Sequence, residues 1–275
     1  MLSILIPANN EAAHIGVCLQ AVMASDGPQA AQIIVAANGC SDDTAKIAKS
    51  FAGTATAKGW TLDVLELPAL GKMGALDAAD AVATFDTRAY LDADVIVDSA
   101  LMGQIAEALL HTDTPRYASG ALRLAPAESK ATRAYARIYA QVPFVIHGVP
   151  GAGLYAVNAA GRARWDKFPG IISDDTFVRL NFTPEERIGV AAGYDWPLVE
   201  GFRALVKVRR RQNAGVAEVA QRFPELLKND DKYRLSTAQK LNMALRDPLG
   251  FLVYASVAVA VKVMGQSQSG WERGR

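Results

Sequence analysis

Hydrophobic and polar residues alternate in blocks along the first hundred residues, and each block has the length of one strand or one helix. The apolar or alternating runs predict strands over Ser3–Pro7, Ile33–Ala37, Thr61–Leu67 and Arg88–Leu91. Helical spacing predicts three helices between them: one with Ile15, Leu19 and Val22 on one face, then Asp42–Phe51 and Gly71–Phe85. This alternation predicts an α/β fold, in which helices flank a mostly parallel sheet.

The pattern is less regular after residue 100. A strand is predicted over Arg116–Leu124 and a helix over Lys130–Gln141. A glycine-rich stretch, Gly148–Gly153, then precedes the apolar run Leu154–Val157. Near the end of the chain, Pro248–Val261 forms an apolar stretch of fourteen residues, shorter than the roughly 20 that cross a bilayer.

The composition, 51% hydrophobic and 21% charged among 275 residues, is that of a globular protein with one sizeable core. Cys18 and Cys40 lack the spacing of a disulfide framework or a zinc site, so we expect a reducing, cytoplasmic setting. The segment Met1–Pro7 carries no basic leader, and its proline follows a short apolar run. It therefore predicts a strand rather than a signal peptide.

Charge is spread unevenly, although the formal net charge is only +1. Residues 1–100 carry twelve acidic and five basic residues, whereas residues 203–246 carry eleven basic and four acidic ones. The acidic half suits a bound cation, and the basic stretch suits phosphates or an anionic membrane surface. Solvated helix faces are an equally good explanation of the basic stretch. Nucleic acid is not expected, because no reader motif or interleaved aromatic residues accompany the charge.

Three polar segments directly follow predicted strands: Pro7–Glu11, Asn38–Asp42 and Asp92–Asp94. Ligands of parallel α/β sheets bind beyond the carboxyl ends of the strands, so we expect these segments to converge on one crevice. Two carboxylates at a strand end suit a hard cation that also contacts substrate phosphates. By itself such a pair is more often ordinary turn chemistry.

Two further features are candidates for the same crevice. Lys72, after Gly71 at a predicted helix start, suits a phosphate, although a surface lysine is the alternative. Asp174 and Asp175 are adjacent, so their repulsion suits one of them to act as a general base. The alternative is a helix N-terminus with Ser173 as its cap. Neighbouring carboxylates do not straddle a glycosidic bond at the ~5–9 Å that a two-carboxylate hydrolase needs.

Taken together, these segments resemble family 2 glycosyltransferases, which have the glycosyltransferase-A fold. The resemblance covers residues 1 to about 215, and the order of its motifs matches the family. The matching segments are Ser3–Glu11, Ile33–Thr44, Gly71–Leu76, Asp92–Asp94, Gly151–Tyr155, Asp174–Thr176 and Arg209–Gln212. There are two departures: Asn38 replaces an aspartate common at that turn, and Gln212 stands where many members have a tryptophan.

The resemblance implies a role for each matching residue. The nucleotide would be held by Pro7, Asn9, Glu11, Asn38 and Lys72. Asp92 would contact the ribose or the metal, and Asp94 would ligate Mg²⁺ or Mn²⁺. Asp175 would be the general base, with Asp174 beside it, and Arg211 would contact the diphosphate. The implied reaction is an inverting transfer from a nucleotide-diphosphate sugar, a UDP-sugar by preference, to an acceptor hydroxyl.

The resemblance also implies a domain organisation. Residues 1–215 would form the catalytic domain, with a nucleotide-binding half over 1–98 and an acceptor half over 99–215. Residues 216–275 would form a helical C-terminal extension. Its apolar stretch would pack on the domain or lie on the inner face of the cell membrane, with Trp271 at the interface. In the second case the acceptor would be a lipid or a lipid-linked glycan.

Two other functions fit part of the pattern. A sugar-phosphate nucleotidyltransferase has a related fold, but it would need a glycine-rich, arginine-bearing loop where this chain has Pro7–Glu11. A non-catalytic scaffold at the membrane would keep the fold without its chemistry. Such a scaffold would be expected to have lost its acidic positions, whereas Asp94 and Asp175 are both present.

Overall fold

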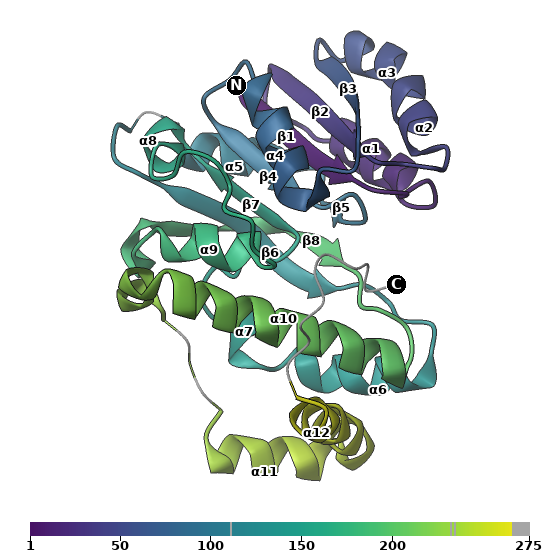
Figure 1. The fold of residues 1–275 in the computed structure, drawn as a ribbon, viewed down its shortest axis with the longest axis vertical. Coiled ribbons are helices and arrows are strands. Elements are labelled where there is room, and N and C mark those ends of the chain that lie inside the picture. Colours follow the sequence, from purple (N-terminus) through teal and green to yellow (C-terminus); the bar gives the residue numbers. More distant parts are fainter. Residues whose placement is uncertain (111, 232, 234, 266–275) are drawn as a thin grey trace.

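The computed structural model describes residues 1–110, 112–231, 233 and 235–265. A single eight-stranded sheet crosses the molecule, and helices cover both of its faces (Figure 1). The strand order is β3-β2-β1-β4-β7-β6-β8-β5. The strands are β1 (Leu2–Ala8), β2 (Ala31–Asn38), β3 (Thr61–Leu67), β4 (Arg88–Leu91), β5 (Ile96–Val97), β6 (Tyr117–Leu124), β7 (Leu154–Val157) and β8 (Arg187–Trp196).

The N-terminal part of the sheet is parallel, as predicted, because β1 pairs in parallel with β2 and β4, and β2 pairs in parallel with β3. Its helices are α1 (Ile15–Met23), α2 (Thr44–Ser50), α3 (Ala52–Ala57) and α4 (Gly71–Ala81). Every residue of β2 is buried, which requires a covering layer on each face. Residues alternate between these layers, so that Ile4 and Ile6 pack on one side of the sheet and Leu5 on the other.

Helix α4 is shorter than the predicted Gly71–Phe85, since it ends at Ala81. The buried side chain of Gln32 explains this end. Its Nε2 donates to the carbonyl of Val82 at 3.0 Å, and its Oε1 accepts from the backbone N–H of Thr84 at 2.7 Å. These bonds satisfy a turn of the backbone that would otherwise have continued the helix.

The second part of the sheet is mixed. Strand β7 runs antiparallel to both β4 and β6, whereas β6 and β8 are parallel. The helices here are α5 (Leu101–Ala108), α6 (Lys130–Tyr139), α7 (Pro143–Ile146), α8 (Ala159–Arg162), α9 (Asp174–Leu180) and α10 (Phe202–Arg222), with a 3-10 turn at Pro184–Glu186. Strand β8 and helix α10 are absent from the sequence prediction. The small residues of β8 and the many arginines of α10 hide the apolar pattern of each element.

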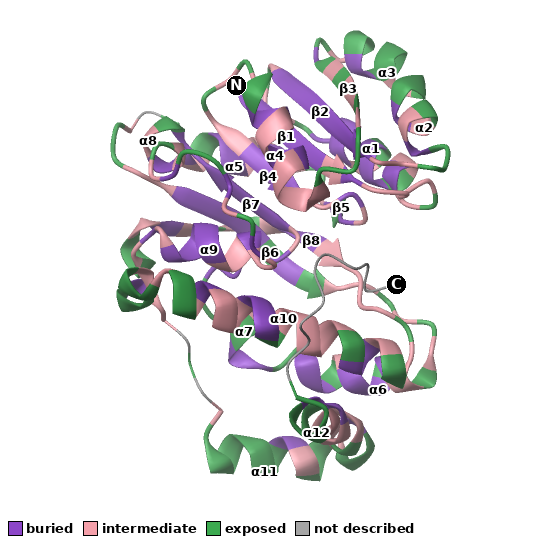
Figure 2. Ribbon diagram, viewed as in Figure 1, coloured by how far each residue is buried: buried purple, intermediate pink, exposed green. Residues whose placement is uncertain are grey.

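The C-terminal part of the described chain lies at the end of the molecule farthest from α2 and α3 (Figure 1). After a 3-10 turn at Pro224–Asn229 it forms α11 (Thr237–Arg246) and α12 (Pro248–Val263). Val257 and Val261 of α12 are buried in a third core with α6 and α10. Figure 2 shows purple buried residues along the sheet, mainly green, exposed residues on α11, and a mixture of exposed, intermediate and buried residues on α12. The predicted division at residue 215 falls inside α10 and stays a prediction, and Trp271 lies outside the described residues.

The glycine-rich loop before β7 is fixed by its backbone and by close neighbours. Gly151 and Gly153 have φ angles of +69° and +78°, in the left-handed region that disfavours other residues. A β-carbon on Gly151 would overlap the hydroxyl of Tyr117, and one on Gly153 would lie 2.7 Å from the Trp196 ring. The loop therefore lets the aromatic side chains approach the backbone closely.

We predict that Gly151→Ala lowers the free energy of unfolding by about 2–4 kcal/mol, from the left-handed backbone and the clash with Tyr117. The matched control is Gly170→Ala, because a β-carbon there meets nothing within 4 Å. Denaturant titration of both variants tests this. Equal stabilities would contradict the packing argument.

Candidate active site

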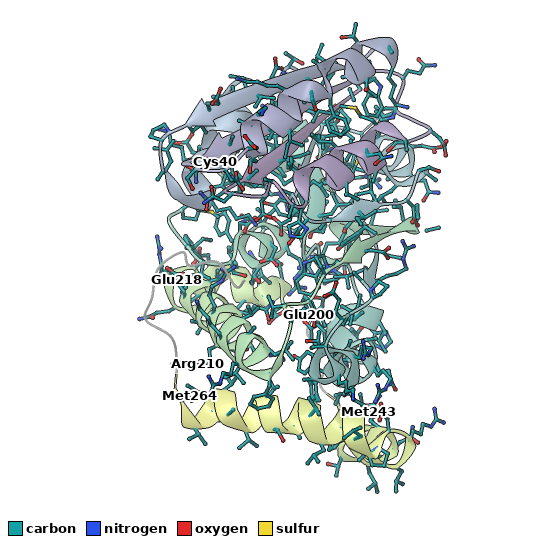
Figure 3. All side chains as sticks on the ribbon, turned by 90° about the vertical axis from the view of Figure 1, so that its right-hand side faces the viewer. Cys40, Glu200, Arg210, Glu218, Met243 and Met264 are labelled. Atoms are coloured by element: carbon teal, nitrogen blue, oxygen red, sulfur yellow. The ribbon has the colours of Figure 1, made fainter. Side chains whose placement is uncertain are left out.

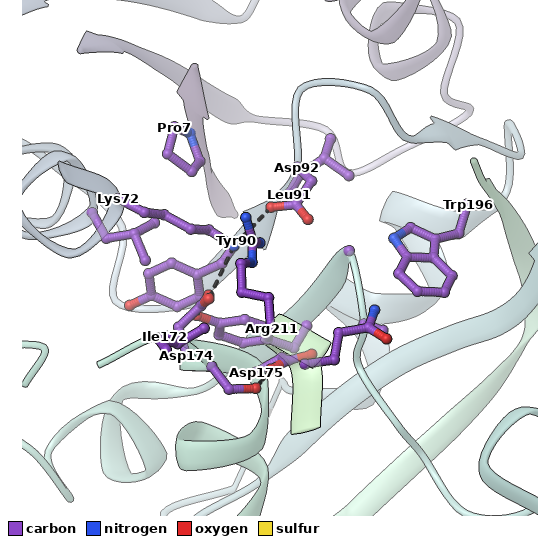
Figure 4. Close-up of a pocket in the computed structure, with 16 residues that line it drawn as sticks. Pro7, Lys72, Tyr90, Leu91, Asp92, Ile172, Asp174, Asp175, Trp196 and Arg211 are labelled. Carbon is purple, nitrogen blue, oxygen red and sulfur yellow. Dashed lines mark hydrogen bonds and ion pairs between the residues drawn. The ribbon is translucent and has the colours of Figure 1, made fainter. Parts of the chain in front are cut away.

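A pocket of about 670 Å³ opens where the N-terminal strands end and α9 and α10 face them (Figure 4). Six residues predicted from the sequence line it: Pro7, Lys72, Asp92, Asp174, Asp175 and Arg211. Pro7 and Asp92 come from the ends of β1 and β4, and Lys72 comes from the first turn of α4. The expected convergence of strand ends is therefore observed for these positions.

Lys72 joins the two sides of the pocket. Its Nζ lies 2.9 Å from a carboxylate oxygen of Asp92 and 2.9 Å from one of Asp174, as Figure 4 shows. Burial by itself lowers the pKa of Lys72, but Asp174 and then Asp92 raise it, so that the net pKa is raised. The lysine therefore stays protonated and holds two carboxylates that would otherwise repel each other.

Asp174 has a second partner below the pocket. Its other carboxylate oxygen accepts a hydrogen bond of 3.0 Å from the hydroxyl of Tyr155 in β7. The Tyr155 ring stacks on Tyr90 at 4.9 Å between centroids, and on Tyr117 at 6.2 Å. Because Asp174 is almost fully buried, these bonds are what make its charge tolerable there. They also fix the position of the N-terminus of α9.

Asp175 is held differently from its neighbour. Its Oδ1 accepts hydrogen bonds of 2.7 Å from the Ser173 hydroxyl and 2.7 Å from the Thr176 backbone N–H. Burial raises the pKa of Asp175, and the charge of Asp174 raises it further, while the two hydrogen bonds lower it. The net pKa is raised, so this carboxylate is a better proton acceptor than an ordinary aspartate. The Ser173 hydroxyl thus bonds Asp175 and does not cap α9, although the residue occupies the N-cap position.

Asp92 and Asp94 both lie close to the thiol of Cys18. Burial raises the pKa of that thiol, and Asp94 and Asp92 raise it further, so Cys18 is an uncharged core residue. The backbone N–H of Asp92 donates to the carbonyl of Gly153 at 2.8 Å, which ties the acidic segment to the glycine-rich loop.

A divalent cation would find oxygen ligands in this acidic segment. No group of three or more histidine, cysteine or acidic residues that suits a metal occurs among the described residues. Asp92 and Asp94 would therefore supply at most two carboxylates, with substrate phosphates and water as the remaining ligands. This is the usual arrangement for a small hard cation bound with its substrate.

Four predicted site residues do not line the pocket: the nucleotide ligands Asn9, Glu11 and Asn38, and the metal ligand Asp94. The side chain of Asn9 donates to the carbonyls of Asn38 and Gly39, at 2.6 and 3.2 Å. The buried Asn38 side chain accepts from the backbone N–H of Leu70 at 2.7 Å, just before Lys72. In this structure both asparagines support the loops beside the site, and their contact with a nucleotide stays a prediction.

Sequence reasoning did not single out Trp196 or Tyr90, which also line the pocket. Trp196 ends the unpredicted strand β8, on the side of the pocket away from Lys72 (Figure 4). Tyr90 lies in β4, and Asp92 directly follows the end of this strand. Its position two residues before a candidate carboxylate is the one feature of the sequence that could have identified it.

The fold, with a pocket at the ends of its strands, is that of solved glycosyltransferases. The family model for glycosyl transferase family 2 matches residues 3–137, and this part of the chain is therefore a family 2 domain. The resemblance drawn from the sequence is confirmed, as is the predicted glycosyltransferase-A fold. A search of curated proteins found no match.

Solved structures of glycosyltransferases share the fold. The mannosyltransferase PcManGT from Pyrobaculum calidifontis, in complex with GDP-Man and Mn²⁺, aligns with a TM-score of 0.56 and 16% identity over 97% of this chain and 76% of that one. Glucosyl-3-phosphoglycerate synthase from Mycobacterium tuberculosis, in complex with Mn²⁺, UDP and glucosyl-3-phosphoglycerate, aligns with a TM-score of 0.53 and 18% identity over 81% of this chain and 79% of that one. S. aureus TarS 1-349, in complex with UDP-GlcNAc, aligns with a TM-score of 0.52 and 15% identity over 94% of this chain and 81% of that one.

Proposed function

We propose that this protein is an inverting glycosyltransferase in which Asp175 is the general base. The acceptor hydroxyl gives its proton to Asp175 while its oxygen attacks the anomeric carbon of the donor. The new bond forms on the face opposite the leaving group, and the bond to the diphosphate breaks. The nucleoside diphosphate leaves with the electron pair.

The contacts of the three pocket carboxylates carry this assignment. Asp92 and Asp174 both form ion pairs with Lys72, so each of them already has a cationic partner inside the pocket. Asp175 combines a place in the pocket with a raised pKa. Transfer should therefore fail as the pH falls through the raised pKa of Asp175, because the base is then protonated. Asp174 is the positioning residue beside it.

For the donor side we propose a divalent cation, Mg²⁺ or Mn²⁺, held by Asp94 and Asp92. Such a cation neutralises the charge that develops on the diphosphate leaving group. The structural neighbours with Mn²⁺ and a nucleotide or nucleotide sugar support this proposal. Arg211 and Lys72 line the pocket together with Asp92 and would contact the phosphates. A UDP-sugar is the proposed donor, and two of the three neighbours above contain UDP or a UDP-sugar.

We further propose that the acceptor is a lipid or lipid-linked glycan, reached by docking on an anionic membrane surface. Helices α11 and α12 leave a set of large apolar side chains exposed: Leu241, Leu245, Leu249, Leu252, Val259 and Val263. On α12 these lie along one stripe, on the side roughly opposite Val257 and Val261 in the core. Figure 3 shows the two yellow helices along one edge of the molecule.

Charges next to this surface favour an anionic bilayer as its partner. Lys240, Arg246 and Lys262 are exposed on the two helices, whereas their one acidic neighbour, Asp247, is paired with Arg137 at 2.6 Å. Cations beside an apolar helix face are typical of segments that lie in the membrane interface. Within the described residues, no helix has both the length and the apolar character to cross a bilayer.

Asp175→Asn should lower the rate of sugar transfer by at least about 100-fold, because the general base is lost. Nucleotide binding should persist, since the substituted amide keeps the shape of the side chain. Steady-state rates and calorimetric nucleotide titration measure the two effects. The control is Asp86→Asn, an exposed position in the turn before β4. Transfer at the wild-type rate would remove Asp175 from its role.

A thermal-shift panel of UDP-, GDP- and dTDP-sugars tests the donor. We expect the UDP-sugar, at about 100 times its Kd with Mn²⁺, to stabilise the protein by about 2.7 kcal/mol. Asp94→Ala should remove the part of this stabilisation that depends on Mn²⁺, and Asp86→Ala should not. The metal assignment fails if Asp94→Ala keeps the same metal dependence. If a GDP- or dTDP-sugar stabilises the protein and the UDP-sugar does not, the proposed donor is wrong.

The membrane proposal predicts that the protein floats with vesicles that contain phosphatidylglycerol and not with neutral phosphatidylcholine vesicles. Replacing Leu245, Leu249 and Leu252 together by glutamine should weaken vesicle binding at least about tenfold, from lost apolar burial. The control is Val17→Gln, which is exposed on α1. Equal flotation of the triple variant and the wild type would rule out this surface.

A further inference from the structure

A second cavity, of about 370 Å³, lies beside the active-site pocket. Its walls come from α6, α10, the last residue of β8, Trp196, and the segment 197–199 that follows it. Trp196 and Gln212 line both cavities, so the two are neighbours on either side of these residues.

The lining of this cavity is largely apolar. Tyr135 and Tyr139 of α6 stack at 5.4 Å between ring centroids, and each is almost fully buried. Leucines and valines complete the wall: Leu198, Val199, Leu205 and Val208. Arg209 is the one charged residue of the lining, and its guanidinium lies over the Tyr139 ring at 5.5 Å. Flat rings and branched aliphatic side chains suit a hydrocarbon chain, whereas a sugar would require many more hydrogen-bonding groups.

The cavity lies between the active site and the apolar surface of α12. The Tyr135 ring packs on Tyr254 of α12 at 5.3 Å, and both cavity tyrosines share a core with Val257 and Val261. The exposed stripe of α12 is on the other side of that helix. A molecule that extends from the active site through this cavity therefore points toward the proposed membrane surface.

We infer that this cavity binds the apolar chain of the acceptor, while the acceptor hydroxyl lies in the adjoining active-site pocket. The acceptor would then be an amphiphile whose hydrocarbon chain begins close to the reacting sugar or alcohol. This inference rests on the proposed function, because it names the acceptor of the same reaction. It differs from the membrane proposal, since the hydrocarbon chain of the acceptor enters the protein, whereas the membrane proposal concerns only contact with its surface.

Binding of alkyl glucosides to the full chain tests the inference, with octyl glucoside below its micelle concentration compared with methyl glucoside. Each buried methylene improves binding about fourfold, so burial of only two gives at least about a tenfold preference for octyl glucoside. Val208→Trp should abolish this preference, because the indole occupies the cavity. Val216→Trp is the matched control, on the same helix but outside both cavities.

Leu198→Ser, in the segment after β8, provides a second variant that removes apolar lining without filling the cavity. It should reduce the preference for octyl glucoside at least about threefold. An unchanged preference in folded Val208→Trp and Leu198→Ser, or equal binding of both glucosides to the wild type, would overturn the inference. Donor binding is measured separately with a UDP-sugar. A protein that binds octyl glucoside in this cavity but no nucleotide sugar would refute the proposed function alone.

Discussion

The ion pairs of Lys72 with Asp92 and Asp174 hold the active site together. The three residues come from three separate parts of the chain: the start of α4, the end of β4 and the start of α9. Asp174 is almost fully buried, whereas Lys72 and Asp92 are partly exposed, so removing Lys72 would leave the buried charge of Asp174 without its cationic partner. The pairs therefore fix the distance between the nucleotide-binding strand ends and the helix that carries Asp175.

The support beneath these ion pairs is aromatic. Tyr155 bonds Asp174 and stacks between Tyr90 and Tyr117, while the glycine-rich loop passes over Tyr117 and beside Trp196. Large side chains fit here because Gly151 and Gly153 have none. Burial in this part of the molecule raises the pKa of Asp175, and the charge of Asp174 raises it further. The chemistry of the site thus depends on the packing around it.

The proposed binding sites for the donor, the acceptor and the membrane follow one another through the molecule. The donor pocket lies at the strand ends, the second cavity lies beside it, and α12 packs beneath that cavity. A soluble donor and an acceptor held at a membrane would then meet at Asp175 from opposite sides. Binding of both substrates around one half-buried base also limits the entry of water, which would hydrolyse the donor.

The sequence by itself determined the alternating strands and helices of the first hundred residues. Their apolar periods are local properties, and their strand ends predicted that Pro7 and Asp92 meet at one crevice, with Lys72 at a helix start as a further candidate. It also identified Asp174 and Asp175, through their order along the chain. Tertiary structure alone decided which carboxylate pairs with Lys72. It also showed that Asn38 supports a loop, and that β8 and α10 bring Trp196 and Arg209 beside the site. Those facts depend on contacts between distant segments, and small or charged residues leave no periodic pattern from which such contacts could be predicted.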